Sequence, residues 1–327
     1  MTSGGTELLF LAPHFLLCTW ALKCSEGRHL RNTSTAGIRV SPLQLSAIMD
    51  KTQPFKLLDA YFDAGGNFID QSEQWIGEWM EKRGNRDQVV IALKHASDFR
   101  SHAVGKGKTP TPAATTGAAC ISAPNWIDIL YLHWWDHTTS IEEVMDGLHI
   151  LVEHGKVLYL GISDTPAWVV SAANMYAMLQ GKAQSSIYQG RWNGMLRDFE
   201  REIIPMARQF GVALAPWDER KKKGEGIRSI MSSGQSEDEV KMSEALATVA
   251  GEHNIKSVTA IALAYVLAKT TNVFPIVGGR KVEHLQDNIQ ALKIKLTQEQ
   301  IDFLESVKPF EPGLPSNFVG EEPRVRG

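Results

Sequence analysis

The stretch IDILYLHWWDHTTSIEEVMDGLHILVEHGKVLYLGIS, residues 127–163, contains the pattern that decides the fold. It begins and ends with apolar runs, at 127–134 and 156–163, that read as strands buried on both faces. Between them, residues 140–154 carry apolar side chains at the spacing of an amphipathic helix. Two buried strands joined by a helix indicate a parallel βαβ unit, so this stretch predicts a parallel sheet covered by helices.

The same alternation extends outward over most of the chain. Strands are predicted at 39–45, 67–70, 89–94, 127–134, 156–163, 185–189, 212–217 and 273–278. Helices are predicted at 54–64, 72–82, 140–154, 166–179, 198–209, 239–250, 257–269 and 281–292. Eight such strand units predict an α/β protein with a single domain, the (β/α)8 or TIM barrel. A doubly wound sheet is the alternative, but no G-x-G-x-x-G follows any predicted strand.

Two stretches interrupt this rhythm. Residues 100–125 are rich in Gly, Pro, Thr and Ala where a helix is expected, and residues 218–238 are charged and then rich in Gly and Ser. The second stretch predicts a long mobile loop. We expect an N-terminal extension at 1–26, the barrel at 27–310 and a C-terminal tail at 311–327.

Composition excludes several classes of partner. The chain has 327 residues and a net charge of −3, so no overall positive field favours nucleic acid or an anionic membrane. Three cysteines show neither metal-ligand spacing nor an even disulfide framework, which favours a reducing, cytoplasmic location. The apolar run at 8–22 is short for a membrane span, and no Lys or Arg precedes it as in a signal peptide.

Three consecutive predicted strands end in ionisable residues. Asp70 closes the second strand, Lys94 the third and His133 the fourth. Each residue alone is more simply a rim residue that reaches solvent, but three in succession weaken that interpretation. Since the chemistry of such barrels lies at the C-terminal ends of the strands, an acid, an amine and an imidazole there predict a proton-handling site.

A second group of residues follows the last predicted strand. Gly278 and Gly279 precede Arg280 and Lys281, where the next helix begins. Glycines let the backbone approach a phosphate, and a helix N-terminus supplies free N–H groups. Alone the pattern is weak, but phosphate sites are frequent after strand eight of a barrel.

Several long segments resemble the aldo-keto reductases, most closely the fungal aryl-alcohol dehydrogenase-like branch that includes norsolorinic-acid reductase. They include FKLLDAYFDAGGNFID, WIGEWMEKRGNRDQVVIALK, YQGRWN and ALAYVLAKTTNVFPIVGGRKVEHLQDNI. The resemblance implies a (β/α)8 barrel that binds NADPH without a Rossmann domain. It also implies hydride transfer between the nicotinamide and a small aldehyde, ketone or alcohol, here an aromatic or polycyclic intermediate of a fungal secondary-metabolite pathway.

The resemblance assigns roles to individual residues. The family's catalytic group is an Asp, a Tyr, a Lys and a His, and Asp70, Lys94 and His133 match three of the four. No metal is implied. The residues expected to bind NADPH are Ser163, Asp164, Gln189, Trp217, Gly278, Gly279, Arg280, Lys281, Asp287 and Asn288.

The fourth catalytic residue is missing. In the family, the loop after the strand that ends in Asp carries the Tyr, whereas GGNFIDQSEQWIGEW, residues 65–79, passes from strand to helix without that loop. Tyr131 shares the face of His133 but lies about 6–7 Å deeper along the strand, so it is expected to fill the barrel. Proton delivery then falls to His133 or water. The alternative function is a catalytically impaired NADPH-binding barrel, either a pseudoenzyme or the product of an altered gene model.

Overall fold

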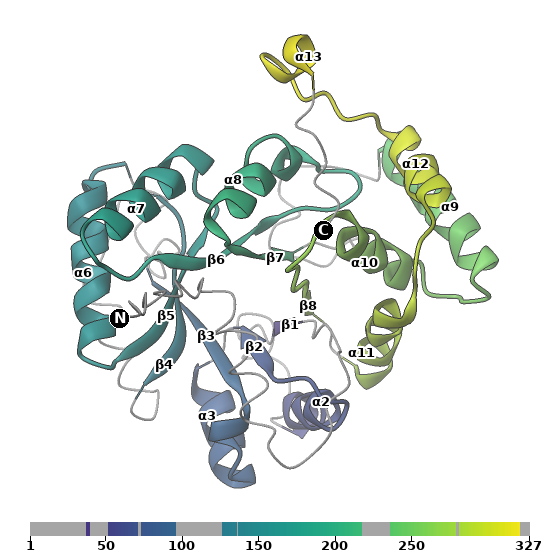
Figure 1. The fold of residues 1–327 in the computed structure, drawn as a ribbon. Coiled ribbons are helices and arrows are strands. Elements are labelled where there is room, and N and C mark those ends of the chain that lie inside the picture. The colour runs from purple at the N-terminus through teal and green to yellow at the C-terminus, as the bar shows by residue number, and fades with distance from the viewer. Residues whose placement is uncertain are drawn as a thin grey trace, which may run out of the picture.

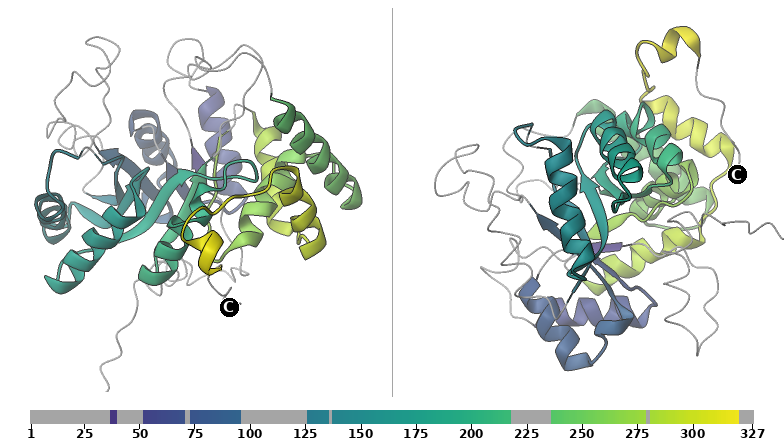
Figure 2. Two further views of the ribbon diagram at one scale, coloured as in Figure 1. Left: turned by 90° about the horizontal axis from the view of Figure 1, so that it is seen from above. Right: turned by 60° about the vertical axis from the view of Figure 1, so that its left-hand side comes forward.

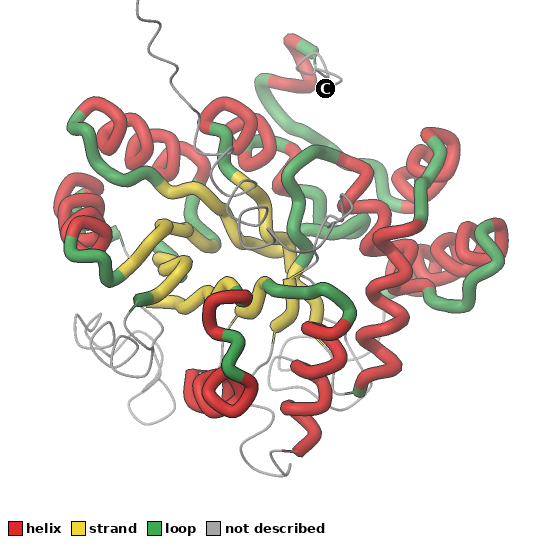
Figure 3. Tube along the Cα trace, turned by 60° about the horizontal axis from the view of Figure 1, so that its bottom comes forward, coloured by secondary structure: helices red, strands yellow, loops and turns green. Residues whose placement is uncertain are grey.

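The computed structural model describes residues 37–39, 52–70, 73–95, 126–135, 137–217, 236–278 and 281–320. Within these residues, eight parallel strands form a closed barrel in chain order, which confirms the predicted fold (Figures 1 and 3). The strands are Gly37–Arg39 (β1), Phe68–Asp70 (β2), Val90–His95 (β3), Ile127–Leu132 (β4), Val157–Ser163 (β5), Ser185–Arg191 (β6), Ala213–Trp217 (β7) and Ile276–Gly278 (β8).

Helices surround the ring of strands (Figures 1 and 2). The described α-helices are Thr52–Asp63 (α2), Glu73–Arg83 (α3), Ile141–Glu153 (α6), Ala167–Leu179 (α7), Ile203–Phe210 (α8), Glu237–Glu252 (α9), Val258–Lys269 (α10), Val282–Ile289 (α11), Gln298–Val307 (α12) and Ser316–Val319 (α13). Short 3₁₀ helices occupy Arg86–Gln88 (η2), Asp198–Glu200 (η3) and Gln290–Lys293 (η5). None of the helices in this described part of the chain has the length and apolar content needed to cross a membrane.

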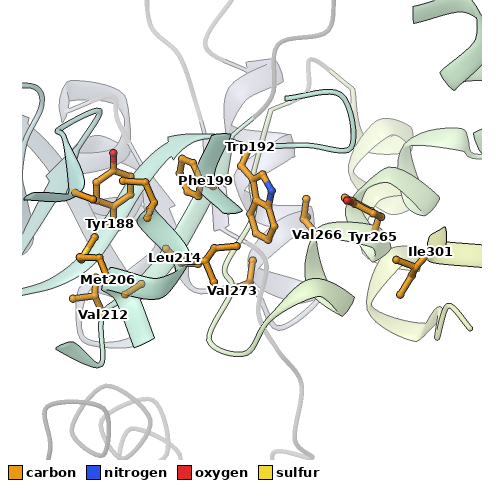
Figure 4. Packing of buried hydrophobic residues seen from close by; sticks show 14 of the residues in the cluster. Tyr188, Trp192, Phe199, Met206, Val212, Leu214, Tyr265, Val266, Val273 and Ile301 are labelled. Atoms are coloured by element: carbon orange, nitrogen blue, oxygen red, sulfur yellow. The ribbon is translucent and has the colours of Figure 1, made fainter. Parts of the chain in front are cut away.

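The strands are buried on both faces, as their apolar sequences predict. Inside the barrel lie mostly small or β-branched side chains: Phe68, Ala92, Ile129, Tyr131, Ile187, Ala213, Ala215 and Ile276. Outside the barrel, the strands pack against the helices in two larger apolar clusters. Figure 4 shows part of one of them, where Trp192 and Phe199 stack with their ring planes 8° apart.

Glycine shapes the barrel interior at one position. A Cβ atom on Gly161 of β5 would lie 2.5 Å from the ring of Tyr131 on the neighbouring strand. The absence of a side chain at 161 therefore makes room for the tyrosine ring, which is fully buried at the centre of the barrel.

Several predicted elements differ from the structure in their bounds. The first strand is Gly37–Arg39 rather than 39–45, and residues 40–45 lie outside the described part. The helix predicted at 198–209 is divided into η3 and α8. A continuous helix would place Pro205 in its interior, whereas the restart at Ile203 places it in a first turn, where its missing N–H is tolerated.

A further helix, α12, was not predicted. It begins with a capping box, in which the side chain of Thr297 accepts from the N–H of Gln300 and the Gln300 side chain accepts from the N–H of Thr297. The predicted loop at 218–238 ends early for a similar reason, since Ser236 and Glu239 form a capping box that starts α9 at Glu237. The rest of that loop, the stretch at 100–125 and the extension at 1–26 lie outside the described residues.

Candidate active site at the mouth of the barrel

Strand periodicity places most of the predicted site residues nearer the barrel mouth than the interior side chains. Side chains two residues apart on a strand share a face, so the residue that follows an interior residue by two also points inward, one layer nearer the mouth. The pairs of interior residue and predicted site residue are Phe68 and Asp70, Ala92 and Lys94, Gly161 and Ser163, Ile187 and Gln189, and Ala215 and Trp217. Tyr131 and His133 have the same spacing, but His133 follows the end of β4. Five strands therefore each place one predicted site residue at the same end of the barrel, and His133 follows the end of a sixth.

Asp70 and Lys94 form a buried ion pair at this end. The Lys94 ammonium donates to both carboxylate oxygens of Asp70, at 2.5 and 2.7 Å. The two side chains are 0 % and 2 % exposed, so both charges are removed from water. Loss of either partner destabilises the folded protein strongly, because the other charge is then left buried and uncompensated.

Lys94 also lies over the ring of Tyr131. Its nitrogen is 5.3 Å from the centre of the Tyr131 ring, and the two residues are aligned in the register of β3 and β4. The electron-rich face of the tyrosine ring therefore stabilises the positive charge of the ammonium.

His133 follows the last residue of β4 and is half-buried. Its imidazole stacks on the ring of Trp134, with centroids 4.5 Å apart and planes 21° apart. Since β4 lies next to β3, His133 follows the strand adjacent to the one that carries Lys94.

The connection beside Asp70 is as short as the sequence predicts. β2 ends at Asp70 and α3 begins at Glu73, which leaves only two residues between them. No tyrosine lies in this connection.

All six tyrosines of the chain lie in the described residues, and their side chains have other positions. Tyr131 and Tyr159 belong to the barrel interior. Tyr176 donates to Asp146 outside the barrel at 2.9 Å. Burial raises the pKa of the remaining three, whose hydroxyls donate to the Phe68 carbonyl, the Thr165 carbonyl and the Glu305 carboxylate: Tyr61, Tyr188 and Tyr265.

The end of β5 is held in a defined shape. Asp164 has a φ of 45°, in the left-handed region, and its N–H donates to the Gln189 carbonyl at 3.0 Å. The Thr165 hydroxyl donates to the Ser163 carbonyl, and Tyr188 donates to the Thr165 carbonyl at 2.8 Å. Local strain held in place by such contacts is a feature of ligand-binding loops.

These supporting residues were missed by sequence reasoning. Thr165 and Tyr188 carry no signal in a single sequence, because their role comes from a hydrogen bond between residues 23 positions apart. The positive φ of Asp164 is equally invisible before the structure is known.

Gln189 connects this region to the ion pair. It aligns with Ser163 in the register of β5 and β6, and its side-chain N–H donates to Asp70 at 3.4 Å. Ser163 and Gln189 are both fully buried, and the Ser163 hydroxyl donates to Asp164 at 3.3 Å. The end of β7 adds the half-buried ring of Trp217.

The predicted phosphate-binding segment is described in part. Gly278 ends β8 and is exposed, and Lys281 is the exposed N-cap of α11. Gly279 and Arg280 lie outside the described residues. On α11, Asp287 is exposed, whereas Asn288 is buried and its side-chain oxygen has no hydrogen-bond partner among the described residues.

These features fit a nicotinamide dinucleotide. A hydroxyl group ends β5, the amide of Gln189 lies two residues before the end of β6, an aromatic ring ends β7, and a basic residue opens the helix after β8. The buried oxygen of Asn288 is an acceptor that such a ligand could satisfy. No group of three or more His, Cys, Asp or Glu side chains in the described ranges is placed to hold a metal ion.

Comparison with known proteins identifies the same family. Residues 43–309 match the aldo/keto reductase family. A probable aryl-alcohol dehydrogenase of Saccharomyces cerevisiae is 56 % identical over 85 % of this chain and 94 % of its own. An aldo-keto reductase of Emericella nidulans is 51 % identical over 92 % and 86 % of the two chains. An NADP(+) aryl-alcohol dehydrogenase of Phanerodontia chrysosporium is 44 % identical over 90 % and 89 %. The chain therefore belongs to the aldo/keto reductase family of oxidoreductases, whose substrates are small carbonyl compounds and alcohols.

Proposed function

We propose that this protein transfers hydride from NADPH to an aromatic or polycyclic aldehyde or ketone in a fungal secondary-metabolite pathway in the cytoplasm. The observation that carries the proposal is the buried pair of Asp70 and Lys94 at the barrel mouth. The names of relatives support the choice of cofactor and of aromatic substrates, since one is named for NADP(+) and two are named aryl-alcohol dehydrogenases.

The charged groups act on the oxygen of the substrate. As the carbonyl is reduced, negative charge develops on this oxygen, and a preorganised positive charge at the mouth stabilises it. Lys94 supplies that charge, and Asp70 holds its ammonium in place through two hydrogen bonds. His133 orients the carbonyl oxygen.

The cofactor site is assigned to the ends of β5 to β8. Bound NADPH supplies the hydride. Ser163, Asp164 and Gln189 hold the nicotinamide carboxamide, and Trp217 stacks on the nicotinamide ring. The residues assigned to the adenosine 2′-phosphate and the adenine are Gly278, Gly279, Arg280, Lys281, Asp287 and Asn288.

The missing tyrosine favours a second candidate function. Reduction needs a proton for the new hydroxyl, and a positioned general acid contributes typically 10²–10⁴-fold to the rate. With only two residues between β2 and α3, this proton falls to His133 or water. The second candidate is therefore a barrel that binds NADPH with little or no turnover.

The two candidates differ in one assay. The protein is incubated with NADPH and a panel of aromatic and aliphatic aldehydes, and NADPH binding is titrated separately by quenching of tryptophan fluorescence. The proposed function predicts slow, protein-dependent oxidation of NADPH with the aromatic aldehydes. Saturable binding without alcohol product would favour the second candidate, and absence of binding would contradict both.

A further inference from the structure

The stack of His133 and Trp134 is unusual for consecutive residues. In an extended strand, neighbouring side chains point to opposite faces of the sheet. Here β4 ends at Leu132 and the chain bends at Trp134, which brings the indole back over the imidazole. The ring centroids are 4.5 Å apart and the planes differ by 21°. The bend therefore creates a contact that the strand itself would prevent.

The next residue, Trp135, has a different environment. Trp135 is half-buried and packs against the apolar cluster outside the barrel. Trp134 remains 40 % exposed, although a tryptophan is among the side chains that gain most from burial. Of the two adjacent tryptophans, Trp135 thus packs against the core and Trp134 stacks on the imidazole of His133.

We propose that Trp134 is a positioning residue that fixes the plane of the His133 imidazole, a role that rests on the function proposed above. An imidazole at the end of a strand can rotate about its side-chain bonds, and a polar catalytic group has to be held within a narrow range of orientations. A flat indole against one face of the ring restricts that rotation. The contact acts on His133, and through His133 on the oxygen of the substrate.

The kinetic test compares Trp134→Leu, Trp134→Phe and the matched control Trp135→Leu. Because misplacement of a catalytic group costs up to about 10²-fold, we expect Trp134→Leu to lower kcat by roughly 10- to 100-fold for aromatic and aliphatic aldehydes alike. KM for NADPH should stay unchanged, and Trp134→Phe should restore most of kcat. Trp135→Leu should lower Tm but leave kcat per folded molecule unchanged.

Two kinetic outcomes would overturn the proposal. An unchanged kcat in Trp134→Leu would show that the stack has no effect on the reaction. A rise in KM confined to aromatic aldehydes, with kcat for aliphatic aldehydes unchanged, would show that Trp134 binds the substrate ring instead.

An NMR measurement tests the stack without turnover. Histidine is labelled with carbon-13 at Cε1 in the protein without ligands, and the resonance of His133 among the ten histidines is assigned with His133→Gln. The ring current of the stacked indole should place the resonance of the proton on Cε1 of His133 upfield. Trp134→Leu should move this resonance downfield, and Trp135→Leu should leave it in place. An unmoved resonance in Trp134→Leu overturns the proposal. Lack of turnover in the wild type would refute the proposed function alone, since this resonance still reports the stack.

Discussion

At the scale of single residues, the buried pair of Asp70 and Lys94 is the feature on which we expect both stability and chemistry to depend. Lys94→Met removes the ammonium and leaves the carboxylate of Asp70 buried at 0 % exposure. We expect the free energy of unfolding to fall by about 3–5 kcal/mol, the range for breaking a buried ion pair. Urea unfolding followed by circular dichroism measures the change.

The control is Lys295→Met, the same change at an exposed lysine, which should alter stability by less than about 0.5 kcal/mol. The double variant Asp70→Asn with Lys94→Met should lose less unfolding free energy than the two single variants lose together, because it leaves no buried charge without a partner. If Lys94→Met is as stable as the wild type, the pair does not carry the energy assigned to it.

A second residue, Glu200 on η3, predicts that the free energy of unfolding depends on pH. Its carboxylate accepts from Arg197 at 2.8 and 2.9 Å and lies 3.1 Å from the Lys269 ammonium. Burial alone would raise the pKa of Glu200, but hydrogen bonds and charge from these two cations lower it below the ordinary value of 4.5.

The folded-state pKa of Glu200 is thus below the unfolded value. Its contribution is fully present above about pH 4.5 and is lost as the pH falls through the folded value. Glu200→Gln should therefore cost about 3 kcal/mol of unfolding free energy at pH 7, and less at pH 3. Exposed Glu202→Gln is the matched control. Equal costs at both pH values would refute the assignment.

Arg280 predicts the preference between cofactors. A guanidinium beside the adenosine 2′-phosphate forms charge-assisted hydrogen bonds that NADH cannot form. Arg280→Ala should weaken NADPH binding by about 1.5–3 kcal/mol and leave NADH binding unchanged. Fluorescence titration measures both, with Arg208→Ala on the exposed face of α8 as the control. Equal affinities of the wild type for NADPH and NADH would contradict the assignment of Arg280 to the 2′-phosphate.

At the scale of elements, we expect the short connection between β2 and α3 to limit the rate of the reaction. Insertion of a relative's tyrosine-bearing loop between Asp70 and Gln71 should restore a proton donor beside Lys94. We expect turnover of aromatic aldehydes with NADPH to rise by a factor within 10²–10⁴. The same loop with its tyrosine replaced by phenylalanine is the control. If both loops give equal gains, or neither gives any, the missing donor does not limit the rate.

The elements were predictable where local pattern and tertiary structure agree. Seven strands lie close to their predicted ranges, because continuous apolar runs are buried on both faces of a barrel. β1 was placed too late, since the run at 39–45 is no less apolar than Gly37–Arg39. The capping box at Thr297 and Gln300 was the available signal for α12, and Pro205 was the signal for the break before α8.

Only those parts of the site that lie at the ends of strands could be predicted from the sequence. Asp70 and Lys94 could be expected to meet, because neighbouring parallel strands end at the same edge and alternate side chains point inward. The Tyr188 contact with Thr165 and the bend that stacks Trp134 on His133 could not be expected. Both depend on how the chain leaves a strand, which periodicity does not specify.

At the scale of the whole molecule, barrel closure brings distant parts of the chain to one mouth. Asp70 and Gln189 are 119 residues apart, yet their side chains are in hydrogen-bond contact across the barrel mouth. β1 lies between β2 and β8, so the segment assigned to the phosphate comes from the end of the barrel sequence and returns beside its start. The proposed cofactor therefore contacts strands from one half of the sequence while the ion pair comes from the other.

The central claim, hydride transfer from NADPH to a carbonyl carbon, is tested most directly by isotope transfer. The protein is incubated for many hours with NADPH deuterated at both C4 positions and with benzaldehyde, and the benzyl alcohol is analysed by mass spectrometry. The account predicts protein-dependent benzyl alcohol with one deuterium at the carbinol carbon and none with Lys94→Met. Benzyl alcohol without deuterium, or no protein-dependent alcohol from any aromatic aldehyde while NADPH is bound, would contradict it.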